Sequence, residues 1–215
     1  MNTTRNRLTR LATISAALAM VSVPASASNL ADGDAEAGAE KITTCAACHG
    51  ANGISVNPVW PSLAGQHSRY IMQQLMWFKN NERVNILMNS QAVMLSEQDM
   101  RDIAAYFESQ APTAREVSNP DTLARGERLY RGGDEERGLP ACIACHGPTG
   151  AGNPGVPYPK VGGQHAAYLA SSLREYATGG ENRSNTEEQN QMTTIAQKLT
   201  PEDIEALSSY MQGLN

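Results

Sequence analysis

Apolar residues recur at helical spacing along this chain. Ile103, Tyr106 and Phe107 lie three and four positions apart, and a segment near the C-terminus repeats that spacing. No segment shows a convincing strand pattern. Helices are predicted over residues 35–44, 69–78, 123–132 and 167–176, and two more are predicted to begin after residues 96 and 200. The pattern therefore predicts an all-α protein.

The last two helices have clear start sites. Ser96 and Thr200 are favourable N-cap residues, and an aspartate follows each of them three positions later, Asp99 and Asp203. Pro201 suits the first turn of the second of these helices. The two segments, 88–107 and 192–211, align with one another without a gap.

Two further landmarks repeat in the same order. The pentad "CAACH" (45–49) recurs as "CIACH" (142–146), and "WPSLAGQHSRY" (60–70) recurs as "YPKVGGQHAAY" (158–168). Repeats of this kind indicate a duplicated structural unit. The polar, proline-containing segment 110–121 falls between the copies. We therefore predict a first domain over 28–112, a linker over 113–119 and a second domain over 120–215.

The N-terminus has the three parts of a secretory signal peptide. A basic head is followed by a run of 13 mostly apolar residues and by the small-residue pattern Ala25-Ser26-Ala27. We predict cleavage after Ala27, which makes residues 1–27 the signal peptide and the mature protein an exported one. The alternative is an uncleaved anchor, but the apolar run is shorter than the 20 or so residues that span a membrane.

The charge of the mature chain argues against one class of partner. Residues 28–215 carry 14 basic and 22 acidic side chains, a net charge of −8, divided almost evenly between the two copies. An acidic surface repels phosphate backbones, so we expect no nucleic acid partner.

All four cysteines of the chain lie in the two pentads: Cys45 and Cys48, and Cys142 and Cys145. The pattern C-x-x-C-H is the attachment signature of c-type haem, in which two thiols bond the vinyl groups of one haem. A zinc site would need further ligands nearby, and a thioredoxin-like pair would follow a strand. The sequence therefore predicts two covalent haem c groups, each with an iron ion.

The pentad histidines, His49 and His146, are the predicted proximal iron ligands. Met88 and Met192 occupy equivalent places in the two copies and are the predicted sixth ligands. Met94 aligns with a lysine in the second copy and cannot share that role.

His67 and His165 are the alternative sixth ligands, since they are the only other histidines in the chain. Each lies in a Gly-Gln-His motif directly before a predicted helix. One interpretation of these motifs is helix entry and packing. The other places Gln66, His67 and Tyr70, with their counterparts Gln164, His165 and Tyr168, near haem propionates at a contact between the domains.

The paired motifs resemble the dihaem cytochrome c4 family, and the resemblance covers the whole mature chain. It implies two tandem class I cytochrome c domains, each packed around one covalent haem with histidine and methionine ligands. It also implies that Pro61 and Pro159 supply the carbonyl oxygens that accept hydrogen bonds from the two proximal histidines.

The resemblance further implies a high-potential electron carrier of the bacterial periplasm, and no enzyme. A quinol-cytochrome c reductase type of complex is the implied donor and a terminal oxidase the implied acceptor. Loose membrane association stays open, and no small-molecule substrate is expected. A dihaem enzyme such as a peroxidase would need an open iron, which the equivalent methionines argue against; a haem-free binding module is the remaining alternative.

Overall fold

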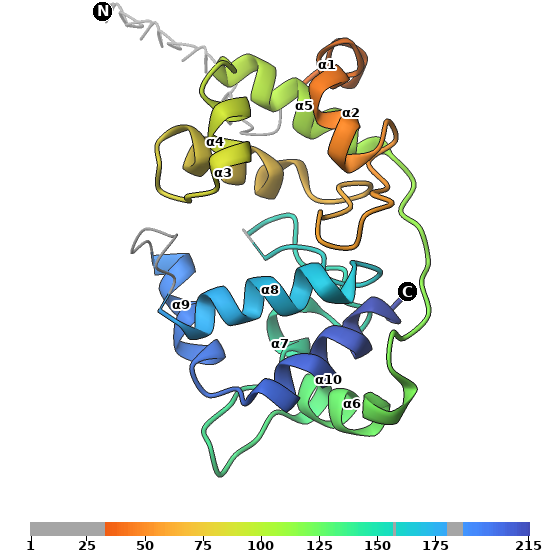
Figure 1. Ribbon diagram of the computed structural model, residues 1–215, viewed down its shortest axis with the longest axis vertical. Coiled ribbons are helices and arrows are strands. Elements are labelled where there is room, and N and C mark those ends of the chain that lie inside the picture. Colours follow the sequence, from red (N-terminus) through yellow and green to blue (C-terminus); the bar gives the residue numbers. More distant parts are fainter. Residues whose placement is uncertain (1–32, 157, 180–186) are drawn as a thin grey trace, which may run out of the picture.

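The computed structural model describes residues 33–156, 158–179 and 187–215, so the predicted signal peptide lies outside the described residues. The described chain forms two helical domains placed end to end (Figure 1). In the described ranges the only β-structure is a pair of isolated bridges, Asp134 with Leu139 and Asn153 with Tyr158. The predicted all-α class is confirmed.

In the part of the chain that the structure describes, each domain contains five α-helices, and a short 3-10 helix leads into the second domain. The first domain contains α1 (Ala35–Lys41), α2 (Thr43–His49), α3 (Ser68–Lys79), α4 (Ile86–Ala92) and α5 (Glu97–Ser109). The second contains η1 (Pro120–Thr122), α6 (Leu123–Gly132), α7 (Ile143–His146), α8 (Ala166–Ala177), α9 (Glu187–Ala196) and α10 (Pro201–Gln212).

The predicted helices are present, and the structure adds helices that the pattern did not predict, α7 (Ile143–His146) among them. The expected helix over 35–44 ends at Lys41, and a separate helix, α2, carries the first pentad. Helices α4 and α9, which contain Met88 and Met192, were not anticipated from the pattern. Both predicted N-caps form capping boxes, in which Ser96 pairs with Asp99 and Thr200 with Asp203.

The last helix of each domain is its central packing element. Helix α5 packs against α1 and α3, and α10 packs against α6 and α8. Met100 and Phe107 on α5 are completely buried, and Leu207 on α10 is almost so. Each domain thus holds its own hydrophobic core.

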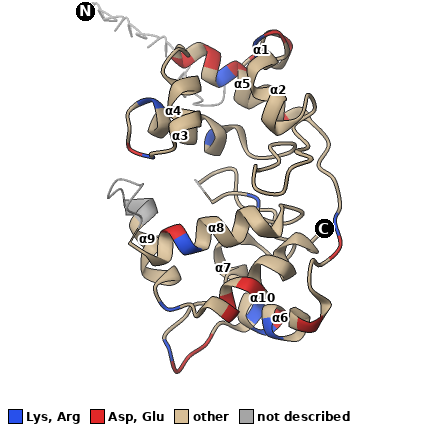
Figure 2. Cartoon of the chain, viewed as in Figure 1, with Lys and Arg blue, Asp and Glu red and all other residues tan. Residues whose placement is uncertain are grey.

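The segment between the domains has no helix over 110–119 and runs along one side of the molecule (Figure 1). The exact domain limits at 112 and 120 stay a prediction. Charged positions gather mainly at the far ends of the two domains, while the facing segments are mostly uncharged (Figure 2). Among the described helices, none is long and apolar enough to cross a membrane.

Candidate haem sites

Both pentads lie on short helices that end at the histidine. Helix α2 ends at His49 and α7 ends at His146, and a glycine with positive φ follows each of them. All four cysteines are half-buried free thiols, so none pairs with another in a disulfide. Burial raises the pKa of the Cys142 thiol to about 11 and also raises the pKa of Cys45.

The two pentad histidines have the same hydrogen bond in both domains. Nδ1 of His49 lies 2.8 Å from the carbonyl oxygen of Pro61, and Nδ1 of His146 lies 2.9 Å from that of Pro159. A carbonyl oxygen can only accept, so Nδ1 carries the proton in each ring. Burial lowers the pKa of both histidines, which keeps the rings neutral. Nε2 is then the ring nitrogen left with a lone pair for a metal.

One mostly apolar cavity of about 410 Å³ joins the two pentads. Its wall contains His49 and His146 together with three of the pentad cysteines, Cys48, Cys142 and Cys145. Cys45 packs instead against the core of the first domain. The cavity continues from one domain into the other, so the two sites open toward one another.

Some methionines lie in the cavity wall, and others lie on the surface or in the core of the first domain. Among the described methionines, those in the cavity wall are Met88, Met192 and Met211, and Met211 is buried in the core of the second domain. Met94 is 83% exposed on the surface. Met72 and Met100 are buried in the first core. The structure thus brings Met88 and Met192 to the same cavity as the two pentad histidines.

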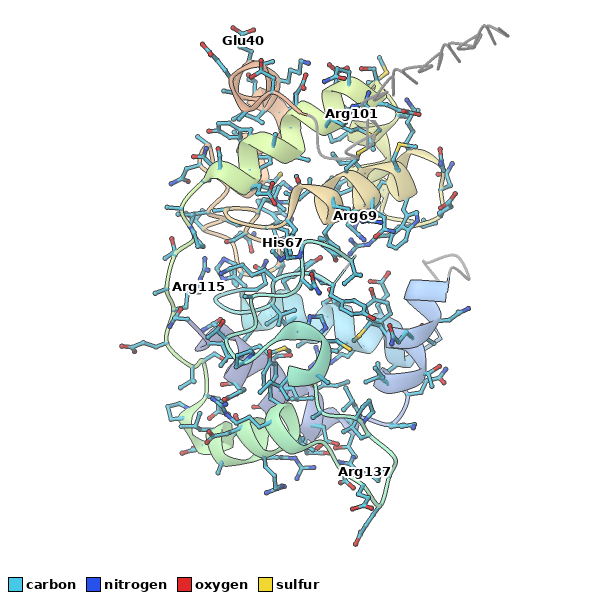
Figure 3. All side chains as sticks on the ribbon, turned by 180° about the vertical axis from the view of Figure 1, so that it is seen from behind. Glu40, His67, Arg69, Arg101, Arg115 and Arg137 are labelled. Atoms are coloured by element: carbon cyan, nitrogen blue, oxygen red, sulfur yellow. The ribbon has the colours of Figure 1, made fainter. Side chains whose placement is uncertain are left out.

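The two rival histidines lie elsewhere. Nε2 of His67 is 2.7 Å from the carbonyl oxygen of Ala151, and Nε2 of His165 is 2.8 Å from that of Ser55. Neither histidine lines the cavity. Each therefore bonds to the backbone of the other domain, and Figure 3 shows His67 at the boundary between the domains.

The polar groups in the cavity wall indicate whether a haem fits there. Arg83 is buried and donates to Oε1 of Gln74 at 2.6 Å. No carboxylate among the described residues lies within ion-pair distance of this guanidinium. Nε2 of Gln74 and Oε1 of Gln73 are buried with no hydrogen-bond partner.

A haem combines an apolar ring with two propionate carboxylates. An apolar cavity with a buried cation and unpaired buried amides matches both parts, because buried polar groups need partners. The residues present therefore fit a haem. Arg83 and Gln74 could not be predicted from the sequence, because an arginine beside a helix end and a glutamine inside a helix are usually solvent-exposed.

The described residues offer no conventional metal cluster. Nowhere in these ranges do three or more His, Cys, Asp or Glu side chains lie close enough together to bind a metal ion. The cavity wall offers imidazole and thioether groups from both domains, beside three of the pentad thiols.

Comparison with known proteins agrees with this geometry. The family model of cytochrome c matches twice, over residues 35–111 and 123–215. Cytochrome c4 of Stutzerimonas stutzeri is 45% identical over 86% of this chain and 91% of that protein. A thiosulfate dehydrogenase electron acceptor of Thiomonas intermedia is 35% identical over 80% of this chain and 78% of that protein.

A solved structure has the same architecture. The crystal structure of reduced recombinant cytochrome c4 from Pseudomonas stutzeri superposes with a TM-score of 0.81 at 45% identity, and covers 85% of this chain and all of that one. Three findings point to the same family: two tandem helical domains, two C-x-x-C-H pentads and a cytochrome c family model that matches twice. The chain belongs to the cytochrome c4 family, and each of its two cytochrome c domains binds one haem c.

Proposed function

We propose that this protein is a high-potential, outer-sphere electron carrier whose two irons have the ligand pairs His49 with Met88 and His146 with Met192. The cysteines of each pentad hold the corresponding haem through thioether bonds. The observation that carries this proposal is the cavity wall, which contains both histidines and both methionines. When bound, haem supplies reversible one-electron chemistry at its iron.

The protein side chains set the conditions for that chemistry. If His49 with Met88, and His146 with Met192, hold the two irons, each iron would have no free position for a substrate. A thioether favours ferrous iron and so raises the potential. The hydrogen bonds to Pro61 and Pro159 fix the histidine rings. Fixed ligands change little between oxidation states, which favours fast electron transfer.

The shared cavity supports transfer between the two haems. Residues of both domains line one continuous space, with Arg83 of the first domain 3.4 Å from the hydroxyl of Tyr168 in the second. An electron that enters at one domain can therefore leave from the other. The molecule is then a relay with a capacity of two electrons.

The proposed location is the periplasm, on the basis of the N-terminal segment 1–27. The proposed donor is a quinol-cytochrome c reductase type of complex and the proposed acceptor a terminal oxidase. A second class of donor is a thiosulfate dehydrogenase, because the relative from Thiomonas intermedia is named as its electron acceptor.

The test combines intact mass with a redox-titrated visible spectrum of the purified holoprotein. We expect the mass of the chain from residue 28 plus two haems, and a far-red ferric band from methionine sulfur on both irons. A mass with one haem would refute the dihaem assignment. A high-spin signal, or ready binding of cyanide or carbon monoxide, would favour an enzyme with an open iron.

A further inference from the structure

Two glutamines cross the boundary between the domains in matching ways. Gln164 of the second domain donates from Nε2 to the carbonyl oxygen of Ser62 at 2.8 Å, and its Oε1 accepts from the amide N–H of Ser62 at 2.9 Å. Gln66 of the first domain makes the same pair of bonds with Lys160, both at 2.9 Å. Both glutamines are buried: Gln66 is 6% exposed and Gln164 is 7% exposed.

The two backbone targets have a special place in the sequence. Ser62 directly follows Pro61, and Lys160 directly follows Pro159. The peptide unit between Pro61 and Ser62 therefore bonds on both sides: its C=O accepts from His49, and its N–H donates to Gln164. A continuous chain of hydrogen bonds thus runs from the histidine of one domain to the glutamine of the other.

The second domain has the same series of hydrogen bonds. The peptide unit between Pro159 and Lys160 accepts from His146 through its C=O and donates through its N–H to Gln66. The sequence alone could not reveal the arrangement, because each glutamine lies 94 or 102 positions away from its target.

Hydrogen bonds in such a chain strengthen one another. When the N–H of a peptide unit donates, more negative charge builds up on its C=O, and this oxygen becomes a better acceptor. A stronger bond from Nδ1–H makes the imidazole a more basic ligand. A more basic ligand stabilises ferric relative to ferrous iron, which lowers the potential of that haem.

We propose that each glutamine is a positioning residue for the iron ligand of the opposite domain: Gln164 acts on His49 and Gln66 acts on His146. This inference rests on the proposed function, in which these histidines bind the irons. Each domain thereby sets the potential of its neighbour's haem, and the two potentials depend on the domains being docked.

The experiment measures the potential of each haem in holoprotein variants, with the two haems distinguished by the NMR signals of their axial ligands. Gln164→Leu should raise the potential of the first-domain haem, with a shift of about twofold to fivefold in its ferrous-to-ferric ratio at a fixed solution potential. The second-domain haem should not change. Gln66→Leu should do the reverse. Exchange of the Nδ1 proton of the affected histidine should also become faster.

His165→Phe is the matched control for loss of domain contact. It removes the contacts with Ser55 and Arg115 in the same boundary, but it removes neither hydrogen bond of the peptide unit between Pro61 and Ser62. It should shift neither potential. If Gln164→Leu folds poorly, Gln164→Asn keeps the amide but shortens its reach by one methylene, and it should give a shift of the same sign.

The inference is overturned if Gln164→Leu shifts the haem of its own domain, or if it shifts both haems. It is also overturned if neither potential moves. Failure of the proposed function has a different signature, because the unmodified protein would then lack ligand signals from His49 or Met88.

Discussion

Nε2 of His165 in the second domain lies 2.8 Å from the carbonyl oxygen of Ser55 in the first. His67 makes the corresponding contact in the opposite direction, with Ala151 at 2.7 Å. The linker residue Arg115 also lies at this boundary (Figure 3), where it donates to Oγ of Ser62 at 3.1 Å and to the carbonyl oxygen of Gly163. The Gly-Gln-His motifs therefore serve the contact between the domains.

Replacing His165 with Phe should loosen this contact without changing axial ligation. The visible spectrum should stay low-spin with its far-red sulfur band, because His165 is not part of the cavity wall. Hydrogen–deuterium exchange should become faster over residues 55–60 and 110–119. Glu40→Gln, at the far end of the first domain, serves as the control and should leave exchange at the boundary unchanged. Loss of the sulfur band in the histidine variant would contradict the proposed ligand set.

Replacing Met88 or Met192 with Ala should abolish the far-red sulfur band of one haem only. The potential of that haem should fall, because the thioether ligand favours ferrous iron. Redox titration followed at visible wavelengths measures both effects. Met94→Ala is the matched control, since Met94 lies near Met88 in the sequence but is 83% exposed. A variant of Met88 or Met192 that keeps both sulfur bands would disprove the assignment.

The stability of the second domain should fall at acidic pH because of Asp203. Its carboxylate is completely buried and accepts from Arg137, Arg125 and the backbone N–H of Thr200. Burial alone would raise the pKa of Asp203, but these hydrogen bonds outweigh it and hold the pKa at about 2. Since this lies below the unfolded value of 3.8, the ionised carboxylate stabilises the fold above about pH 4. That contribution, about 2 kcal/mol, is lost as the pH falls from about 4 to about 2.

Asp203→Asn should accordingly cost about 2 kcal/mol of unfolding free energy at pH 7 and much less at pH 2. Denaturant unfolding followed by circular dichroism at the two pH values measures this difference. Glu127→Gln, which removes an exposed ion pair with Arg131 on α6, should cost no more than about 0.5 kcal/mol. An equal loss at both pH values would show that Asp203 stabilises the domain in another way.

Gly126 lets α6 approach α10 closely. A Cβ at this position would collide with the carbonyl oxygen of Ala206 and would lie 2.7 Å from Cβ of Tyr210. Gly126→Ala should therefore lower the free energy of unfolding by about 1–3 kcal/mol. Gly132→Ala, on the same helix but with no atom within 4 Å of the added Cβ, should be neutral or stabilising by up to about 1 kcal/mol. Thermal unfolding of the two variants measures this difference. Equal melting temperatures would exclude the close approach of α6 to α10.

Local chemistry explains why so much could be predicted from the sequence. The C-x-x-C-H pentads place two thiols and an imidazole on a short stretch of chain, so their role needs no distant partner. The capping boxes at Ser96 and Thr200 likewise depend on residues only three positions apart. The internal repeat identified Met88 and Met192 as equivalent positions, and the fold brings both to the cavity.

The tertiary structure alone decided which groups meet across large sequence separations. The repeat marked Gln66 and Gln164 as equivalent, but only docking of the domains joins them to the peptide units beside Pro159 and Pro61. Arg83 became a cavity residue for the same reason: folding buries it, with no carboxylate partner among the described residues. Sequence periodicity reports which face of one helix is apolar. It carries no information on which buried polar group faces which backbone group, because that depends on how separate elements pack in space.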